Sequence, residues 1–564
     1  MKINETTTLR DLYNFSIDTY GNNKSFSFIN GQSYTYKEFG EKVECLSEML
    51  TSQGINSGEK IALLSQNMPN WSVAYFSAVA FGRVIVPMLP DFSETEIANI
   101  IEHSEAKALF ISKKLLHKVP KELLQKMVVV IETDSLEILF SNPTTQKGIV
   151  KYAEAEDLAT IIYTSGTTGH SKGVMLSHRN MCSHLEAASI LRPGYEWDIW
   201  LSLLPLSHTL ECSLCMLLPM ISGSQVYYIE KAPTPTILLQ ALKEVRPTTI
   251  LSVPLIIEKI YKGTISPQFN KNNFVKTLYS TLIGRKVLNY LAGIKLKKTF
   301  GGRVRFFGIG GAKLDGEVER FLYEAKFPYA IGYGLTETAP LLAGAIPEMV
   351  KWQSTGPAIH GVTLRINNPD PITGEGEIVA KGSNVMMGYY KNEEATKEAF
   401  TEDGWFRTKD LGLLDKKNRL YIKGRLNNMI VGPSGENIYP EEIESVINGH
   451  AMVSESIVTQ NEKGNLVARV HFNPDKIKAL VEAKEEALNA YYSKKEELIT
   501  SYEEKKEEIV KAFDEKMEQL KYELCTYVNS KVNKFSKITI VVDHPQQFEK
   551  TATQKIKRYM YTER

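Results

Sequence analysis

Apolar runs alternate with amphipathic stretches along the chain from about residue 34 to residue 350. Short runs rich in Val, Ile and Leu predict strands at residues 60–65, 84–88, 108–112, 127–132, 249–253 and 304–309. The stretches between them carry apolar residues at helical spacing and predict helices, among them residues 36–53, 71–83 and 93–104. Strands that alternate with helices are typical of βαβ units, so we expect mainly parallel sheets covered by helices.

The pattern changes after residue 356. Residues 356–420 contain short strand-like runs separated by glycines, which predicts a compact β-subdomain. After Gly424 and Arg425 the chain continues as a small α+β unit. A helix is predicted to begin at Pro440, because proline suits the first helical position and the two glutamates that follow favour the N-terminal end of the helix dipole.

A polar segment without glycine or proline runs from Asp475 to His544, and its middle is rich in Glu, Lys and Ala. Apolar residues recur there mostly every three or four positions, at Leu488, Tyr491, Leu498, Tyr502, Ile509, Phe513, Met517 and Leu520. This spacing predicts one long helix or a two-helix hairpin with an apolar seam. The segment is then either a solvated helical insertion or an arm that mediates dimerisation or docks a partner.

A chain of 564 residues is too long for a single hydrophobic core, so we expect at least two domains. The fold class is α/β. A large N-terminal domain, residues 1–424, holds helix-covered sheets and the β-subdomain. A small α+β domain, residues 425–564, carries the helical insertion at about residues 475–530. Hydrophobic residues make up 43% and charged residues 24%, which is typical of a soluble globular protein, and the net charge of +1 gives no reason to expect nucleic acid as a partner.

Five cysteines in so long a chain are too few and too scattered for a disulfide framework, which favours the cytosol. Cys212 and Cys215 form a Cys-x-x-Cys pair, which suits redox or zinc chemistry, but no second such pair or paired histidine lies nearby. Because the pair lies in an apolar run, we expect buried structural cysteines instead. That run, residues 201–221, is interrupted by prolines and polar residues, so we expect no membrane span.

The N-terminal residues lack the apolar core of a signal peptide, and no basic amphipathic helix stands out as a membrane anchor. We therefore expect a soluble cytoplasmic protein.

The densest cluster of candidate chemistry is the segment 164–173, which directly follows the apolar run 158–163. It combines three glycines, several hydroxyl side chains and Lys172. Glycines let backbone N–H groups approach an anion, hydroxyls add donors and the lysine neutralises charge, so this loop indicates a polyphosphate site. It is not a Walker loop, which requires Gly-x-x-x-x-Gly-Lys-Ser/Thr. The alternative is an ordinary polar surface loop.

Four further motifs follow. Residues 306–312 form a strand that ends in closely spaced glycines, for which a purely structural turn is the alternative. Residues 331–338, Ile-Gly-Tyr-Gly-Leu-Thr-Glu-Thr, combine an aromatic ring that can stack on a base with a carboxylate that can hold Mg²⁺. In residues 405–412, Asp410 is a candidate acceptor for both hydroxyls of a ribose, or a solvated turn aspartate. Residues 550–558 are a basic segment that indicates no function by itself.

Together these motifs resemble those of the adenylate-forming superfamily, which includes acyl-CoA synthetases, peptide-synthetase adenylation domains and luciferases. The resemblance covers about residues 10–560. Five elements agree in order and spacing: the loop at 164–173, the motif at 331–338, the Asp410 turn, Gly424 with Arg425, and the lysine motif at 550–558. Within the superfamily, residues 204–208 (Leu-Pro-Leu-Ser-His) and 431–440 are most similar to AMP-forming long-chain acyl-CoA synthetases.

The resemblance implies two half-reactions that use ATP, Mg²⁺ and CoA. The carboxylate of a fatty acid first attacks the α-phosphorus of ATP, which gives an acyl-adenylate and pyrophosphate. The thiol of CoA then attacks the acyl carbon and displaces AMP. Little acid–base chemistry is needed in the first step, so catalysis would depend on positioning and on charge stabilisation.

The resemblance also implies roles for residues of the large domain. The loop would close over the β- and γ-phosphates with Thr164, Ser165, Gly166, Thr167, Thr168, Gly169 and Lys172. The adenine and the acyl carboxylate would be bordered by Gly310, Gly311 and Ala312, with Tyr333 and Gly334 against the adenine. Thr336 would bind the α-phosphate and Glu337 would hold Mg²⁺. His208 would gate or orient the acyl carboxylate, unless it is simply a core histidine.

The resemblance implies roles for a second set of residues, which lies toward the C-terminus. Asp410 would bind the ribose with Arg425 beside it. Lys555 would bridge the attacking carboxylate and the α-phosphate, and a lysine between two anions stays protonated. Asn427 would be the hinge about which the small domain rotates between the two half-reactions. A loop on the CoA side would include Gly432, Ser434 and Gly435.

The chain departs from the family pattern at two positions. Gln554 precedes Lys555 where the family usually has glycine, which affects the packing of the last strand without removing the lysine charge. Asn427 stands where the family commonly has Asp or Lys, and a hinge needs backbone freedom rather than a particular charge.

Several alternatives stay open. The acyl group is transferred either to CoA or to the thiol of a carrier protein, and the acid is either a long-chain fatty acid or a medium-chain or aryl acid. A third alternative is an inactive protein that binds nucleotide or acyl groups and recruits partners through its helical insertion. Use of fatty acids would also suit a peripheral position at the inner face of the membrane.

Overall fold

The computed structural model describes residues 1–143, 146–164, 171–230, 234–431, 437–450, 452–462, 464–478, 482, 500–551 and 555–562. The chain divides into two compact units. Unit 1 comprises Met1–Leu314, Val318–Thr408 and Gly412–Ile422, and unit 2 comprises Asp315–Glu317, Lys409–Leu411 and Lys423–Arg564. Each unit has its own sheets and its own hydrophobic core, and each is described separately.

One sheet of unit 1 has the strand order β20-β9-β8-β4-β3-β5-β6-β7. Its strands are β3 (Lys60–Leu64), β4 (Val84–Met88), β5 (Ala108–Ile111), β6 (Val129–Glu132), β7 (Ile138–Ser141), β8 (Leu158–Thr164), β9 (Lys172–Ser177) and β20 (Gly388–Tyr389). The central strands β8, β4, β3, β5 and β6 pair in parallel. Strands β3 to β6 confirm the apolar runs predicted as strands, and nearly all of their residues are buried, as expected for a parallel sheet covered on both faces.

A second sheet of unit 1 has the order β14-β13-β12-β10-β11-β1-β2. Its strands are β1 (Lys24–Phe28), β2 (Ser33–Thr35), β10 (Ile199–Ser202), β11 (Gln225–Tyr228), β12 (Thr249–Ser252), β13 (Phe306–Ile309) and β14 (Tyr329–Ile331). All neighbours pair in parallel except β1 with β2. The carboxyl ends of β12, β13 and β14 therefore lie along the same edge of the sheet.

Helix α3 (Pro69–Val79) connects the two sheets, since it contacts β3 and β4 of the first and β1 of the second. Every residue of α3 is buried, which explains why its sequence is apolar on all sides rather than on one stripe. The helix begins two residues before the predicted position, with Pro69 in its first turn. It ends before the predicted position, because Gly82 has φ +73° in the turn that leads into β4.

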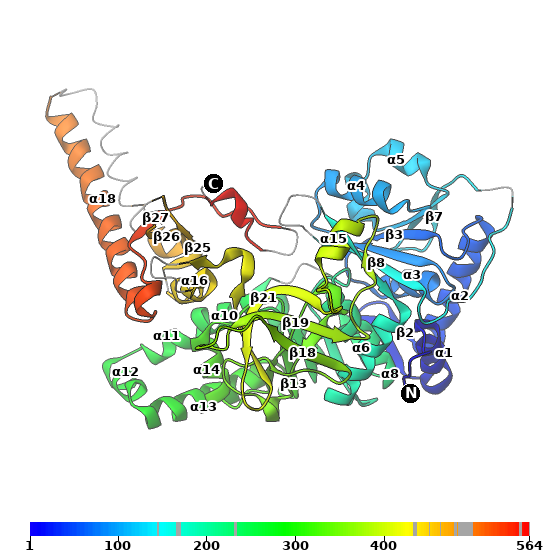
Figure 1. Cartoon of the computed structure of the whole chain (residues 1–564), viewed down its shortest axis with the longest axis horizontal. Coiled ribbons are helices and arrows are strands. Elements are labelled where there is room, and N and C mark those ends of the chain that lie inside the picture. Colours follow the sequence, from blue (N-terminus) through cyan, green and yellow to red (C-terminus); the bar gives the residue numbers. More distant parts are fainter. Residues whose placement is uncertain are drawn as a thin grey trace. The chain divides into compact units, whose positions relative to one another are not determined.

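Unit 1 contains further helices, most of which cover its two sheets (Figure 1). They are α1 (Leu9–Tyr20), α2 (Tyr36–Ser52), α4 (Glu94–Ser104), α5 (Lys121–Lys126), α6 (His178–Leu191), α7 (Thr209–Glu211), α8 (Leu218–Ile221), α9 (Pro235–Val245), α10 (Pro254–Ile260), α11 (Ser266–Phe269), α12 (Asn273–Ser280), α13 (Leu282–Thr299), α14 (Gly316–Glu324) and α15 (Glu393–Glu398). Capping boxes at Thr35 and Ser93 fix the beginnings of α2 and α4, and both helices confirm the prediction to within a residue at each end.

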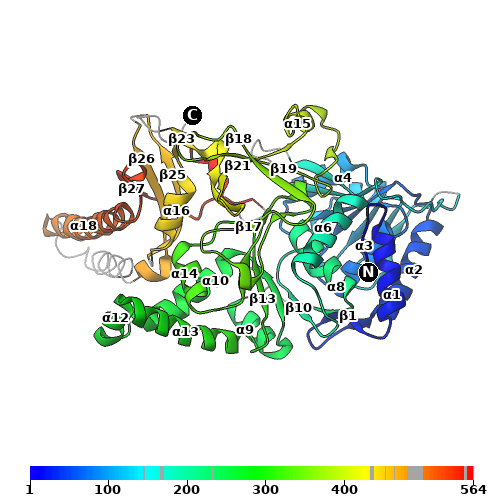
Figure 2. The same ribbon diagram turned by 60° about the horizontal axis from the view of Figure 1, so that its bottom comes forward.

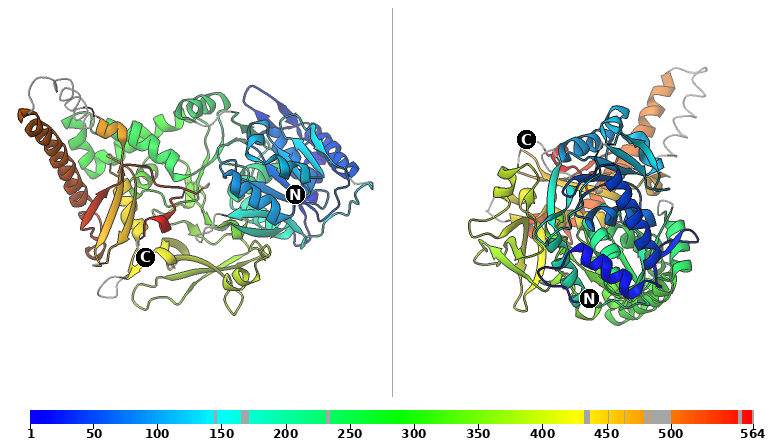
Figure 3. Two further views of the ribbon diagram at one scale, coloured as in Figure 1. Left: turned by 90° about the horizontal axis from the view of Figure 1, so that it is seen from above. Right: turned by 90° about the vertical axis from the view of Figure 1, so that its right-hand side faces the viewer.

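The predicted β-subdomain is confirmed. Its antiparallel sheet has the order β17-β22-β21-β19-β18 and consists of β17 (Gly356–Pro357), β18 (Val362–Asn367), β19 (Gly376–Gly382), β21 (Phe406–Leu414) and β22 (Arg419–Arg425). In both views of Figure 3 its yellow-green strands form a layer of their own beside the blue N-terminal part of unit 1. Strand β21 carries Asp410, and β22 ends at Arg425.

Unit 2 contains a small sheet of β25 (Val453–Gln460), β26 (Leu466–Phe472) and β27 (Ile540–Asp543), with the short pair β23 (Ile430–Val431) and β24 (Asn437–Ile438). Helix α16 (Pro440–Asn448) begins at Pro440, as predicted. Helix α18 (Thr500–Asn529) covers part of the predicted insertion. Met517, Leu524 and Val528 of α18 are buried in the core of unit 2, so this end of the helix is an integral part of the domain rather than a solvated insertion.

Cys212 and Cys215 are free and fully buried, which confirms the structural interpretation of the pair. In the part of the chain that the structure describes, no helix is both long and apolar enough to traverse a bilayer.

Candidate active site

The hairpin of β8 and β9 carries the predicted phosphate loop. The two strands pair antiparallel and place Thr164 opposite Lys172, with the Thr164 hydroxyl 3.5 Å from the Lys172 carbonyl oxygen. The hairpin therefore holds both ends of the loop in one fixed place. Five predicted loop residues lie outside the described residues: Ser165, Gly166, Thr167, Thr168 and Gly169.

Tyr389 on β20 connects two of the predicted residues. Its hydroxyl donates a hydrogen bond to the Glu337 carboxylate at 2.8 Å, and the Lys172 ammonium nitrogen lies 5.1 Å from the centre of its ring. Burial, followed by the nearby charge of Glu337, raises the pKa of Tyr389 well above its ordinary value, so the phenol remains a donor at neutral pH. The sequence analysis missed this residue, because only the long-range pairing of β20 with β9 brings it here.

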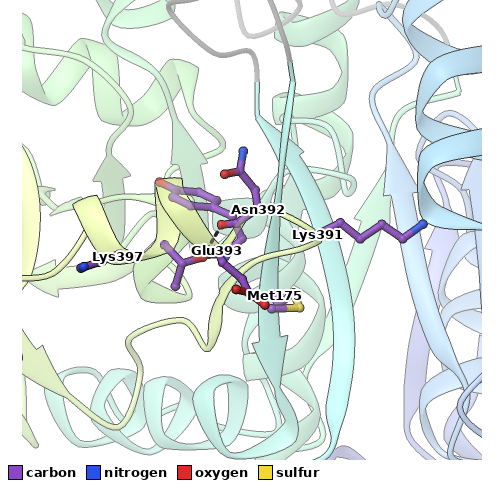
Figure 4. Close-up of a pocket in the computed structure, with 7 residues that line it drawn as sticks. Met175, Lys391, Asn392, Glu393 and Lys397 are labelled. Carbon is purple, nitrogen blue, oxygen red and sulfur yellow. Dashed lines mark hydrogen bonds between the residues drawn. The ribbon is translucent and has the colours of Figure 1, made fainter.

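An open hollow of about 410 Å³ lies beside Tyr389 (Figure 4). It is lined by Met175, Tyr389, Lys391, Asn392, Glu393, Thr396 and Lys397. The side chains of Lys391 and Lys397 extend in opposite directions from the hollow, and Lys391 forms an ion pair of 2.9 Å with Glu105. None of the predicted site residues lines this hollow, and we assign it no ligand.

The motif at residues 331–338 forms a tight turn. Its 3-10 segment, Thr336–Thr338, is held by a hydrogen bond from the Leu335 amide to the Thr338 hydroxyl at 3.0 Å. The side-chain amide of Asn384 donates to the carbonyl oxygens of Thr338 and Leu341 at 2.8 and 2.9 Å. These bonds fix the backbone on both sides of Glu337, whose carboxylate therefore has a defined position.

Gly334 is needed for close packing in this turn. Gly334 is exposed, yet a Cβ atom there would lie 1.7 Å from the carbonyl oxygen of Pro340. Tyr333 beside it is buried. Gly310 is buried at the end of β13, whereas Gly311, with φ +85°, and Ala312 are exposed.

Three segments meet at the carboxyl edge of the second sheet. The pairing of β13 with β14 sets Ile309 opposite Ile331, so Gly310 and the turn that leads to Thr336 leave the sheet side by side. The Thr209 hydroxyl lies 3.5 Å from the Thr336 hydroxyl, which brings the beginning of α7 to the same place. His208 precedes α7, and its Nδ1 accepts a hydrogen bond from the Leu210 amide at 3.2 Å. In parallel sheets, ligands bind at this edge.

Glu211 is a buried carboxyl group that the sequence analysis passed over. Its Oε1 accepts hydrogen bonds from the Ser202 hydroxyl at 2.6 Å and from the Leu203 amide at 3.1 Å. Burial raises its pKa to about 7. The carboxyl group ties the end of β10 to α7, and so fixes both ends of the loop that carries His208. Its only sequence signal is an acid within an apolar run.

The remaining predicted residues lie in unit 2. Asp410 is buried, and its Oδ1 lies 3.3 Å from Nε of Arg425. Asn427 lies in the 3-10 segment Leu426–Asn428 that follows β22. Gly432, Ser434 and Gly435 are outside the described residues, as is Gln554.

Lys555 is exposed near the C-terminus, and its carbonyl oxygen accepts a hydrogen bond from the Thr551 amide at 2.7 Å. The segment is held on unit 2 by Arg558, which donates to the Glu444 carboxylate at 2.6 Å and to the Val458 carbonyl oxygen at 2.9 Å. Of the described predicted residues, Thr336 and Gly310 lie at one sheet edge of unit 1, and Asp410 contacts Arg425 in unit 2, while Lys555 lies in a separate segment of unit 2.

Comparison with known proteins decides the family. The chain matches the family model of AMP-binding enzymes over residues 16–390, which is more than half of its length. The chain belongs to the AMP-binding enzyme family. This confirms the predicted resemblance to the adenylate-forming superfamily.

Two relatives of this AMP-binding enzyme are named as long-chain acyl-CoA synthetases or ligases. It is 28% identical over 526 residues to long chain acyl-CoA synthetase 7, peroxisomal, of Arabidopsis thaliana, covering 84% of this chain and 74% of that protein. It is 29% identical over 480 residues to the long-chain-fatty-acid–CoA ligase FadD15 of Mycobacterium bovis, covering 78% of this chain and 77% of that protein.

A solved structure shows the same fold. It is that of o-succinylbenzoate CoA synthetase (MenE) from Bacillus subtilis in complex with its acyl-adenylate intermediate, which is 21% identical to this chain. The two structures superpose with a TM-score of 0.73, over 99% of this chain and 98% of the MenE chain. The α/β fold with a large N-terminal and a smaller C-terminal domain is thereby confirmed. The AMP-binding enzyme is an acid–CoA ligase of the AMP-forming type.

Proposed function

We propose that the enzyme activates a long-chain fatty acid. The fatty acid and ATP give an acyl-adenylate and pyrophosphate, and CoA then gives acyl-CoA and AMP. The observation that carries the proposal is the similarity over about four fifths of the chain to proteins named as long-chain acyl-CoA synthetases and ligases. The convergence of Thr336, Gly310 and the α7 segment at one sheet edge supports it.

In the first half-reaction a carboxylate oxygen attacks the α-phosphorus of ATP, and the bond to the bridging oxygen of pyrophosphate breaks. The loop from Thr164 to Lys172 would hold the β- and γ-phosphates, and Thr336 would bind the α-phosphate. Lys555 would stabilise the negative charge between the carboxylate and the α-phosphate. Asp410, held by Arg425, would accept hydrogen bonds from the ribose. Neither reactant needs to lose a proton in this step.

Mg²⁺ fits the donor set around Glu337. Mg²⁺ prefers oxygen ligands and is commonly bound by one or two carboxylates together with substrate phosphates. Glu337 supplies one carboxylate, and among the described residues no three His, Cys, Asp or Glu side chains gather to hold a metal ion without the nucleotide. When bound, the ion neutralises phosphate charge. Tyr389 would hold the carboxylate of Glu337 in position toward it.

In the second half-reaction the CoA sulfur attacks the acyl carbon, the bond from that carbon to the AMP oxygen breaks, and the thiol proton is released to solvent. We propose that residues 425–564 form a small domain that rotates on residues 1–424 between the two steps, with Asn427 as the hinge. The loop with Gly432, Ser434 and Gly435 would then lie on the CoA side. His208 would act earlier, by orienting the acyl carboxylate for the first half-reaction.

A product screen tests the proposal. The purified enzyme is incubated with ATP, Mg²⁺, CoA and one acid at a time, from acetate to stearate and including aryl acids, and both acyl-CoA and AMP are measured. We expect the highest kcat/KM with long-chain fatty acids and equal amounts of the two products. A carrier protein replaces CoA in a parallel series.

Preference for medium-chain or aryl acids would overturn the long-chain assignment and leave the ligase activity in place. Acyl transfer to the carrier protein without acyl-CoA would identify an acyl-AMP ligase. Absence of ATP–pyrophosphate exchange with every acid would show that the chain binds its ligands without catalysis.

A further inference from the structure

Helices α12 and α13 expose an unusually large apolar surface on unit 1. Figure 2 shows them along the lower margin of unit 1. Eight of their apolar side chains are exposed: Phe274 (76%), Leu278, Leu282, Ile283 (77%), Val287, Tyr290, Leu291 and Ile294. We call this set the apolar face. No residue of α12 is buried. Tyr279 stacks on Phe269 of α11, but packing inside unit 1 leaves Phe274 and Leu278 exposed.

The orientation of α13 is fixed from its inner side. Arg285 forms an ion pair of 2.8 Å with Glu324 of α14, and Asn289 donates to the same carboxylate at 2.7 Å. Gly293 packs so closely that a Cβ atom there would lie 2.6 Å from the carbonyl oxygen of Ala325. Helix α13 therefore cannot rotate its apolar face inward without losing these contacts.

The apolar face follows one side of α13. Ile283, Val287, Tyr290 and Ile294 are spaced by four, three and four residues, which places them on one stripe of an α-helix. The buried residues Asn289 and Leu296 lie on another side. The sequence analysis found no basic amphipathic helix that stands out as a membrane anchor, and only the structure separates the exposed side of α13 from its inner side. Its inner side also carries apolar residues, Leu288, Ala292 and Leu296, so the periodicity of the sequence could not separate the buried side from the exposed one.

The surroundings of the apolar face are strongly basic. From Lys259 to Leu314 the chain contains twelve Lys and Arg residues and no Asp or Glu, although the whole chain has a net charge of only +1. Five exposed lysines lie on the two helices: Lys276, Lys286, Lys295, Lys297 and Lys298. Within the described residues, none of these five forms an ion pair. Their charge is therefore available to an external anionic partner.

We propose that α12 and α13 dock the enzyme on an anionic phospholipid bilayer. A helix of this kind lies in the plane of the membrane, with its apolar side chains below the headgroups and its lysines at the level of the lipid phosphates. A second copy of this chain fits less well, because its equally basic face would be repelled. A nucleic acid would leave the centre of the apolar face without a suitable contact. The proposal goes beyond the acid–CoA ligase activity and does not depend on which acid is used.

Sedimentation with vesicles tests the proposal on the full-length protein without substrates. We expect binding to vesicles of phosphatidylcholine with phosphatidylglycerol, weak binding to phosphatidylcholine alone, and loss of binding at high salt. The double variant Ile283→Asp with Ile294→Asp should lower the affinity at least about tenfold, because two apolar side chains no longer enter the bilayer. The double variant Lys297→Glu with Lys298→Glu should lower it by a similar factor on anionic vesicles only.

Matched controls lie elsewhere on unit 1. Ile372 is 93% exposed in the turn after β18, so Ile372→Asp introduces the same change outside the apolar face. Lys416→Glu with Lys417→Glu repeats the charge reversal at two exposed lysines of another turn. Both controls should bind vesicles as the wild type does, and the thermal midpoint of every variant shows whether it is folded.

Three outcomes would overturn the proposal: no binding of the wild type to anionic vesicles, equal loss in the Ile372→Asp control, or unchanged binding in folded variants of the apolar face. If the variants instead abolish self-association in sedimentation equilibrium, the apolar face is an interface between copies. A failed product screen would leave these vesicle results unaffected, so the two proposals are tested separately.

Discussion

The phenol of Tyr389 donates a hydrogen bond of 2.8 Å to the carboxylate of Glu337, although 52 residues separate them in the sequence. The pairing of β20 with β9 also brings the Tyr389 ring to Lys172. One side chain thus contacts both the residue proposed to hold Mg²⁺ and the lysine of the phosphate loop. We infer that Tyr389 is a positioning residue for the adenylation half-reaction.

Substitution of Tyr389→Phe tests this inference. The ring over Lys172 is kept, while the hydrogen bond to Glu337 is lost. We expect kcat/KM for MgATP in pyrophosphate exchange to fall about tenfold, mainly through a higher KM, since a hydrogen bond to a charged group is removed. Tyr390→Phe is the control, because the Tyr390 hydroxyl bonds to exposed Glu105 instead. Equal effects of both substitutions would contradict the positioning role.

Gly334→Ala should destabilise the enzyme by more than about 2 kcal/mol, because the new Cβ atom would overlap the Pro340 carbonyl oxygen and force the backbone apart. Gly263→Ala is the matched control, since no atom lies within 4 Å of a Cβ atom at that position. Denaturant unfolding measures both. An unfolding free energy for Gly334→Ala within error of the wild type would show that this turn adapts easily.

The buried carboxyl group of Glu211 predicts a pH dependence of stability. Its pKa is raised to about 7 in the folded protein, so the folded state holds a proton that the unfolded state has already released above about pH 4.3. Stability should therefore fall as the pH rises from about 4.3 to 7, by on the order of 3 kcal/mol from this group.

Glu211→Gln removes the ionisation and keeps an oxygen that can accept from Ser202 and Leu203. Relative to the wild type, the variant should gain stability as the pH rises toward 7 and keep that gain above it. Urea unfolding across this pH range gives the comparison. Glu348→Gln, at an exposed carboxylate, should retain the wild-type pH slope. If the unfolding free energies of Glu211→Gln and the wild type change in parallel with pH, Glu211 does not titrate in this range.

Lys555→Ala should separate the two half-reactions. Loss of the positive charge between the carboxylate and the α-phosphate should lower pyrophosphate exchange at least about a hundredfold. Transfer from supplied acyl-AMP to CoA should largely survive. Lys557→Ala is a neighbouring control, since Lys557 lies 3.6 Å from Glu549 and has no proposed contact with substrate. Equal loss of both half-reactions would indicate a structural role for Lys555.

The local pattern predicted much of the secondary structure because buried strands and amphipathic helices differ in period and length. Strand β4 matches the predicted residues 84–88 at both ends, and Pro440 begins α16 as expected. The ends of helices and strands were less predictable where backbone geometry decides them. Helix α3, for example, ends before its predicted end because Gly82 has a positive φ in the turn that follows. The sequence analysis described residues 475–530 as a solvated helical insertion or a docking arm, whereas Met517 and Leu524 of α18 are not solvated but belong to the core of unit 2.

The sequence by itself determined the fold class, the family and the set of candidate residues, because glycine spacing, hydroxyl clusters and single charged residues are local properties of the chain. Only the tertiary structure decided that Tyr389 contacts Glu337, that Glu211 is a buried carboxyl group, and that the outer side of α13 is exposed. Each of these depends on which distant segments pack together. Burial and long-range strand pairing set the environment of a side chain, and that environment is not a property of the neighbouring residues in the sequence.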